Sequence, residues 1–158
     1  MRWGEFAAAE PEMATAIRRR LEIGKHHYLA TRREDGSPRI SGQEFYFTED
    51  GRDCWFGCMA RSRKVRDLLG DPRFALHGRS EDPPEWSGDA KIAGNAIRVE
   101  DDAERQRLLQ SVGHPGGDCE VFLVELTEAV LTRLSESGEH LDVTLWKPDK
   151  GVRTMQTQ

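Results

Sequence analysis

The sequence predicts a mainly β fold of the α+β type: a closed or nearly closed antiparallel barrel decorated by helices. About seven segments have the composition of strands and three that of short helices, and short turns with an acidic residue before glycine join several strands. Strands and helices do not alternate regularly, which argues against a parallel sheet built from strand–helix–strand units. All 158 residues are expected to form one domain, since a chain of this length commonly holds one.

The first half of the chain predicts one helix followed by three strands. Residues 11–23 begin with proline, which favours a first helical position, and they carry apolar side chains on one face. The three strands are expected at 26–32, 38–48 and 53–59. The turns between them contain Asp35-Gly36 and Asp50-Gly51, pairs that favour tight hairpins. These strands are therefore expected to form an antiparallel meander.

The second half of the chain predicts two helices, four strands and a tail. A short amphipathic helix is expected at 63–69, because Ser62 is a favourable N-cap and Gly70 a favourable stop. Asp101 is expected to cap the other helix. The strands are expected at 73–79, 89–99, 120–134 and 140–147. The tail at 150–158 is expected to be partly loose.

Composition limits the classes of partner and the location. The net charge of −5 argues against nucleic acid or an anionic membrane as the main partner, because both need a basic surface. No apolar run approaches the ~20 residues of a membrane span, and the N-terminus lacks the apolar core of a signal peptide, so a cytoplasmic location is expected. Cys54, Cys58 and Cys119 are expected to be buried free thiols, and no metal site is predicted, because zinc-like ligand spacing is absent.

The start of the helix at 63–69 carries the strongest sign of a binding site. The first turn of a helix has unpaired N–H groups and a partial positive charge that favour acidic residues, yet this helix is entered through Arg61, Arg63 and Lys64. A phosphate group would satisfy the N–H groups, the helix dipole and the cationic side chains together. The alternative is that these side chains are simply solvated, as most exposed charge runs are.

Several motifs resemble those of the pyridoxamine 5′-phosphate oxidase-like FMN-binding split barrels. The resemblance spans most of the chain and includes Asp35-Gly36-Ser37-Pro38-Arg39, Ser62-Arg63-Lys64, Asp71-Pro72-Arg73 and Trp146. Its most specific element is the serine–arginine–lysine motif followed by a short helix and the aspartate–proline–arginine motif. The resemblance implies an antiparallel split β-barrel that binds FMN.

The resemblance also implies which residues bind the cofactor. In the family, the arginine and lysine of the motif hold the FMN phosphate, and the strand that begins at the position of Arg39 lies along the isoalloxazine ring. The cofactor-binding residues implied here are Arg39, Ile40, Ser41, Cys58, Met59, Ser62, Arg63, Lys64 and Trp146. Trp146 is expected to reach across the interface of a homodimer that holds the cofactor between its subunits.

The implied activity is that of an FMN-dependent oxidoreductase, a reductase or oxidase acting on a small-molecule substrate. Glu44 stands where true pyridoxamine phosphate oxidases carry a lysine, so the phosphate of that substrate would meet a carboxylate and we do not expect that activity. No catalytic side chain is predicted, because redox chemistry of this type belongs largely to the cofactor. Two alternatives remain: a reductase that uses the 8-hydroxy-5-deazaflavin coenzyme, which relatives of this fold use, and a non-catalytic flavin or haem carrier.

Overall fold

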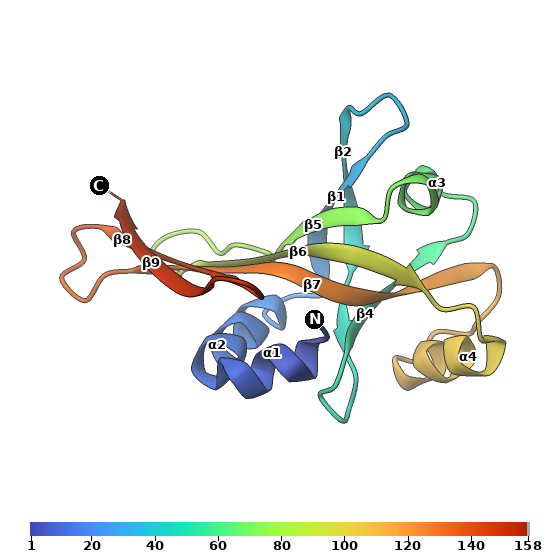
Figure 1. Ribbon diagram of the computed structural model, residues 1–158, viewed down its shortest axis with the longest axis horizontal. Helices are drawn as coiled ribbons and strands as arrows, with labels where there is room; N and C mark the ends of the chain where they lie inside the picture. The colour runs from blue at the N-terminus through green and yellow to red at the C-terminus, as the bar shows by residue number, and fades with distance from the viewer. Residues whose placement is uncertain (158) are drawn as a thin grey trace.

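The computed structural model describes residues 1–157, which form four helices and one antiparallel sheet of nine strands (Figure 1). The helices are α1 (Trp3–Ala9), α2 (Pro11–Leu21), α3 (Arg63–Gly70) and α4 (Asp102–Ser111). The strands are β1 (His26–Arg32), β2 (Pro38–Glu44), β3 (Tyr46–Phe47), β4 (Cys54–Met59), β5 (Arg73–His77), β6 (Asp89–Arg98), β7 (Cys119–Leu134), β8 (Leu141–Lys147) and β9 (Gly151–Thr157). The prediction of a mainly β, antiparallel fold is confirmed, with one more helix and two more strands than expected.

The strands follow the order β2-β1-β5-β6-β7-β4-β3 and curl into a split barrel, while β8 and β9 extend the sheet from β7. The two hairpin turns predicted from sequence are present. Gly36, between β1 and β2, has a φ of +83°, and Gly51, between β3 and β4, has a φ of +67°. Glycine adopts this left-handed conformation at low cost, which explains why each turn places it there.

The barrel is split where β2 lies beside β4. The predicted strand at 38–48 is interrupted at Phe45, whose buried side chain points away from the ladder and into the core. Before this bend, β2 pairs with β1; after it, Tyr46 and Phe47 of β3 pair with β4. In the part of the chain that the structure describes, no backbone ladder joins β2 to β4. The chain therefore leaves one side of the barrel and joins the other through a single bent segment.

The long ladder between β6 and β7 contains a bulge at Gly94. The register of the two strands shifts between Ala93 and Gly94. A Cβ atom on Gly94 would lie 2.1 Å from the carbonyl oxygen of Glu125 on β7, so only glycine fits there without a backbone shift. The close approach at Gly94 is thus made by the backbone of β7.

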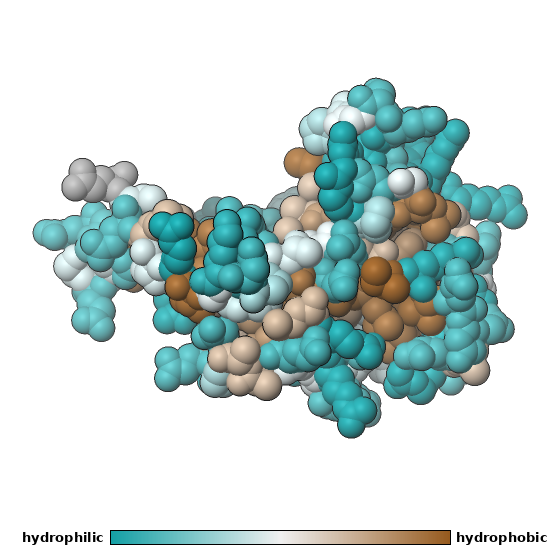
Figure 2. All heavy atoms as spheres, in the orientation of Figure 1, coloured by the Kyte–Doolittle hydropathy of each residue, from teal (hydrophilic) through white to brown (hydrophobic). Residues whose placement is uncertain are grey.

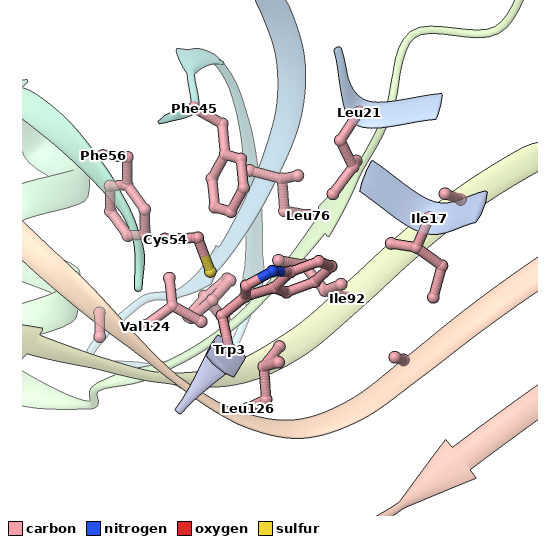
Figure 3. Close-up of a cluster of buried hydrophobic side chains, with 14 of the residues drawn as sticks. Trp3, Ile17, Leu21, Phe45, Cys54, Phe56, Leu76, Ile92, Val124 and Leu126 are labelled. Carbon is pink, nitrogen blue, oxygen red and sulfur yellow. The ribbon is translucent and has the colours of Figure 1, made fainter. Parts of the chain in front are cut away.

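The N-terminal helices cover one face of the sheet, and α2 packs on β6 and β7. Trp3 of α1 and Ile17 and Leu21 of α2 lie among the buried side chains of the strands (Figure 3). Helix α1 was not predicted, because seven residues are too few to show a helical period. It is held to the barrel by Trp3 and by a hydrogen bond of 2.8 Å from the backbone N–H of Gly4 to the carbonyl of Arg52.

Strand β9 corrects the prediction that the tail at 150–158 is partly loose. It pairs with β8 from Gly151, opposite Lys147, to Thr157, opposite Leu141. Most of its side chains are exposed and show no alternation, so the partner strand and not the segment's own pattern makes it a strand. Gln158, the last residue of that tail, lies outside the described residues.

Polar and apolar side chains are divided between surface and interior as expected, except that some large apolar side chains are exposed. Cys54, Cys58 and Cys119 are free and buried, as predicted. Within residues 1–157, none of the helices combines the length and the apolar character that a membrane span requires. Some large apolar side chains are nevertheless exposed, among them Ile97 at 47% and Leu69 at 55%. Figure 2 shows hydrophobic surface gathered between α3 and α4.

The bulge generates the first prediction. Replacing Gly94 with alanine should lower the free energy of unfolding by about 3 kcal/mol or more, because the new Cβ atom would force the β6 and β7 backbones apart. The matched control is Gly42→Ala on β2, where a Cβ atom would meet nothing within 4 Å and the change should stay within about 0.5 kcal/mol. Urea unfolding of both variants measures the difference, and equal stabilities would contradict the role of the bulge.

Candidate functional site

The start of α3 offers unsatisfied hydrogen-bonding groups. Ser62 occupies the N-cap position with an extended backbone, but its hydroxyl forms no cap, is buried and has no hydrogen-bond partner in the protein. The first turn holds Arg63 and Lys64 and no acidic residue. The free N–H groups and the positive end of the helix dipole favour an anion at this position. The basic helix start predicted from sequence is therefore present.

An open pocket of about 1080 Å³, here called the arginine pocket, lies between α3 and the β1–β2 hairpin. Its lining residues are Arg32, Arg33, Glu34, Asp35, Arg39, Arg63, Arg66, Asp67, Gly70 and Asp71. Arg32 and Arg39 each contact an aspartate. Within the described chain, Arg63 and Arg66 form no ion pair. Arg33 also forms none and donates only to Ser37 Oγ at 3.4 Å, so three guanidinium groups of this pocket have no carboxylate partner and can bind an anion.

A buried ion pair ties α3 to the strands at the base of the arginine pocket. Asp67 is 8% exposed and accepts hydrogen bonds from Thr31 Oγ1 at 2.8 Å and from Arg39 Nε at 2.6 Å. Burial acts to raise the pKa of Asp67, but the hydrogen bonds from Arg39 and Thr31 outweigh it and hold that pKa below its ordinary value. Asp67 therefore fixes the guanidinium of Arg39 at the wall of the pocket and leaves its remaining N–H groups available.

The side chain of Gln43 bridges the split between β2 and β4. It is 4% exposed, and its Nε2 donates to the carbonyls of Glu44 and of Gly57 on β4, each at 2.8 Å. Its Oε1 accepts from Lys64 Nζ at 2.9 Å and from Cys58 Sγ at 3.2 Å. Both amide protons and both lone pairs are thus used, which makes this a fully satisfied buried polar group. Gln43 replaces the backbone ladder that β2 and β4 lack.

Lys64 belongs to this seam and does not line the arginine pocket. Besides Gln43, its Nζ donates to the carbonyl of Gly42 at 2.6 Å. Two of its three protons are therefore committed within the protein, and the ammonium group joins the start of α3 to β2. The predicted contact between Lys64 and a phosphate would have to use the one proton that remains.

A second pocket of about 470 Å³, here called the Glu44 pocket, lies on the other side of the seam. Residues of β2, β3, β4 and α4 line it, among them Glu44, Tyr46 and Met59. Tyr46 donates its hydroxyl to Glu44, and burial together with this bond raises the pKa of Tyr46 well above its usual value. Burial also raises the pKa of the Cys58 thiol to about 12, so this thiol stays protonated and donates to Gln43.

Strand β2 connects the two pockets. Arg39 lies in the arginine pocket and Glu44 in the other, about 17 Å apart at ~3.3 Å per residue. Between them, the hydroxyl of Ser41 is buried without a hydrogen-bond partner, and the space beside Gly42 is open. The groups present fit an elongated ligand with an anionic end at the start of α3 and a flat end along β2. FMN has this form.

Among the nine predicted cofactor residues, Arg39 and Arg63 line the arginine pocket, and Cys58, Met59 and Lys64 line the Glu44 pocket. Ser41 on β2 and Ser62 at the start of α3 line neither, but their hydroxyls are buried without a partner among the described residues. Ile40 is different: it is 72% exposed and lines a third pocket of about 160 Å³, which Arg39 and Ser41 do not line, because neighbouring residues of a strand face opposite sides. Ile40 therefore lies outside both pockets described above.

Trp146 requires a correction. It is 2% exposed and packs against Phe6 of α1, with ring centroids 4.5 Å apart. Its strand, β8, directs this side chain to the face that α1 covers. Trp146 is thus a core residue of its own chain, and it cannot reach across an interface to a cofactor.

Reasoning from sequence missed Arg66, Asp67 and Gln43. Arg66 follows Arg63 by three positions, so both lie on one face of α3, and this spacing could have identified it. The buried position of Asp67 beside three apolar helix residues was a weaker signal. Nothing in the sequence indicates that Gln43 bridges β2 and β4, because its partners come from segments that are far apart in the chain.

Comparison at the level of sequence finds one family. The family model described as pyridoxamine 5′-phosphate oxidase matches residues 13–129. No curated protein matches the chain. The matched segment contains β2 and α3, and so the walls of the arginine pocket and the seam.

Solved structures show the same fold at low identity. PhzG from Burkholderia lata, in complex with tetrahydrophenazine-1-carboxylic acid, gives a TM-score of 0.65 and 19% identity, covering 98% of this chain and 92% of its own. A pyridoxamine 5′-phosphate oxidase-related FMN-binding protein from Nostoc punctiforme gives 0.62 and 15%, covering 94% and 96%. An F420 reductase gives 0.52 and 23%, covering 69% and 91%. These likenesses confirm the split-barrel fold.

The Asp67 ion pair generates the second prediction. Asp67→Asn should lower the free energy of unfolding by about 2–4 kcal/mol at pH 7, because it leaves the largely buried Arg39 without a counter-charge. Since the folded pKa of Asp67 lies below its unfolded value, its contribution is complete above about pH 4 and is lost as pH falls through the folded pKa. The variant should therefore lose less stability than the wild type as pH falls below about 4, as measured by urea unfolding at a series of pH values. Parallel pH curves would contradict this.

Proposed function

We propose, because this chain belongs to the pyridoxamine 5′-phosphate oxidase family, that it binds FMN and acts as an oxidoreductase on a small-molecule substrate. The observation that carries the proposal is the uncapped start of α3, where Arg63 and Arg66 stand without ion pairs beside strand β2. The FMN-binding relative from Nostoc punctiforme, which shares this fold, supports the choice of cofactor.

The residues of the arginine pocket would hold the phosphate. Arg63 and Arg66 supply charged donors, and the free N–H groups and the Ser62 hydroxyl supply neutral ones. Arg39, held by Asp67, would contribute from the opposite wall without losing side-chain entropy on binding. The ring would lie along β2, on the face where Gly42 offers space.

The chain's own residues would bind and orient the cofactor, while bound FMN would supply the hydride or electron transfer. The seam formed by Gln43 and Lys64 keeps β2 fixed against β4, which holds one surface rigid for the ring. Cys58 lies next to this surface, but its raised pKa keeps it a thiol and therefore a poor nucleophile toward a flavin. No side chain of the protein is assigned an obligatory proton transfer.

The deazaflavin coenzyme is the second candidate. The arginine pocket, at about 1080 Å³, is larger than a phosphate group needs, and Arg33 at the hairpin extends its basic wall. A coenzyme with a phosphate and an anionic tail would fill this space. The likeness to an F420 reductase supports this candidate.

We also propose a homodimer with the cofactor at its interface. The outer face of β1, β2, β5 and β6 exposes apolar side chains, including Tyr28 at 59% and Ile40 at 72%. This face also carries Ala75 and is continuous with Gly42, which pairs with Tyr28. A second copy on this face would cover the apolar surface and the open side of the ring site together.

The third prediction concerns the phosphate. Arg63→Ala should weaken FMN binding tenfold to a hundredfold, since it removes a charged hydrogen bond worth about 1.5–3 kcal/mol. Arg19→Ala on α2 is the matched control, because Arg19 is exposed and lies outside the arginine pocket. Quenching of FMN fluorescence on titration measures both affinities.

Parallel titrations with coenzyme F420 separate the two candidates. Tighter binding of F420 than of FMN, with the same dependence on Arg63, would replace FMN with the deazaflavin. Unchanged FMN affinity in Arg63→Ala would remove the phosphate assignment altogether.

The fourth prediction concerns the dimer. Ala75→Arg places a charge in the middle of the exposed apolar face and should convert a dimer to a monomer with at least tenfold weaker FMN binding. Ala103→Arg on α4, which is equally exposed but away from that face, should remain dimeric. Light scattering gives the mass of each variant, and a monomeric wild type that binds FMN tightly would rule out the interface.

A further inference from the structure

Glu44 presents an open carboxylate to its pocket. Tyr46 donates to one carboxylate oxygen. His26 lies with Nε2 3.9 Å from the other oxygen, Oε1, which is beyond hydrogen-bond distance, and the His26 side chain is 79% exposed. Across residues 1–157, no lysine or arginine forms an ion pair with Glu44. The Glu44 side chain is 45% exposed, so its Oε1 is an acceptor that a ligand in the pocket can reach, on a carboxylate oriented by Tyr46.

In the described part of the chain, the lysine and arginine side chains around the pocket form no ion pair with Glu44. Lys64 lines the same pocket, but two of its three protons are donated to the neutral acceptors of Gly42 and Gln43. Asp118 is on the rim and pairs with Arg61 at 3.3 Å. Within residues 1–157, Glu44 is thus the carboxylate of this pocket that has no lysine or arginine partner.

Aromatic and apolar side chains surround this carboxylate. The Tyr46 ring lies 4.8 Å from the Trp55 ring, and both residues line the pocket. Met59 of β4 and Leu109 of α4 add apolar wall. The volume of about 470 Å³ lies in the range of small-molecule sites. A flat organic ligand with one positive end matches this combination of apolar walls and one fixed carboxylate.

We propose that the Glu44 pocket is the substrate site and that it selects flat molecules bearing a protonated amine or amidine, which donates to Glu44 Oε1. This inference rests on the proposed function, because the pocket lies at the end of β2 toward which the flavin ring would extend. Tyr46 is a positioning residue that holds the carboxylate in one orientation. A substrate with a phosphate or carboxylate at this end is disfavoured by repulsion from Glu44.

The experiment compares two probes of the same shape and opposite charge, benzamidine and benzoate, against the FMN-loaded protein by isothermal titration calorimetry. Benzamidine should bind at least tenfold more tightly than benzoate. Glu44→Gln should weaken benzamidine at least tenfold, and Glu44→Lys should reverse the preference. Tyr46→Phe should weaken benzamidine twofold to fivefold. Glu139→Gln, an exposed carboxylate far from the pocket in sequence and outside its lining, is the matched control and should change nothing.

Equal affinity of the wild type for the two probes, or benzamidine binding that survives Glu44→Gln unchanged, would overturn the inference. FMN affinity is measured on every variant as a separate readout. If FMN binds normally but the affinity for benzamidine does not depend on Glu44, the inference is overturned and the proposed function stands. A protein that fails to bind FMN but binds benzamidine through Glu44 supports the pocket and overturns the proposed function.

Discussion

The satisfied amide of Gln43 is the interaction on which the candidate site depends. The barrel has no backbone ladder between β2 and β4, so these strands could separate if nothing else joined them. Gln43 bonds to Gly57 on β4 and accepts from Lys64 at the start of α3, which brings two strands and a helix to one point. Because each group of the amide is paired, the joint is both specific and costly to break.

This joint also separates two pockets of opposite character. The arginine pocket holds free guanidinium groups beside a helix start, while the pocket beyond the seam presents the carboxylate of Glu44. Strand β2 runs from one to the other and is fixed at its far end by Gln43 and at its near end by the Arg39–Asp67 pair. A rigid strand between a basic pocket and a pocket with a carboxylate can orient an elongated molecule without ordering loops.

How much of the site the sequence could reveal depends on the range of each interaction. The basic start of α3 was predictable because Ser62, Arg63 and Lys64 are adjacent in the chain and helix electrostatics are local. The commitment of Lys64 to the seam was not, because its acceptors are 21 and 22 positions away. Trp146 was misplaced for the same reason: its position follows from Phe6, at the other end of the chain.

By itself, the sequence determined the antiparallel class, the hairpin turns at Gly36 and Gly51, and the amphipathic helix at the candidate site, since turn chemistry and side-chain period act over a few residues. Only the tertiary structure decided the break at Phe45, the pairing that makes β9 a strand and the burial of Asp67 beside Arg39. Each of these requires a partner from a distant segment. Local propensity cannot specify such contacts, because their free energy appears only when the barrel brings both partners together.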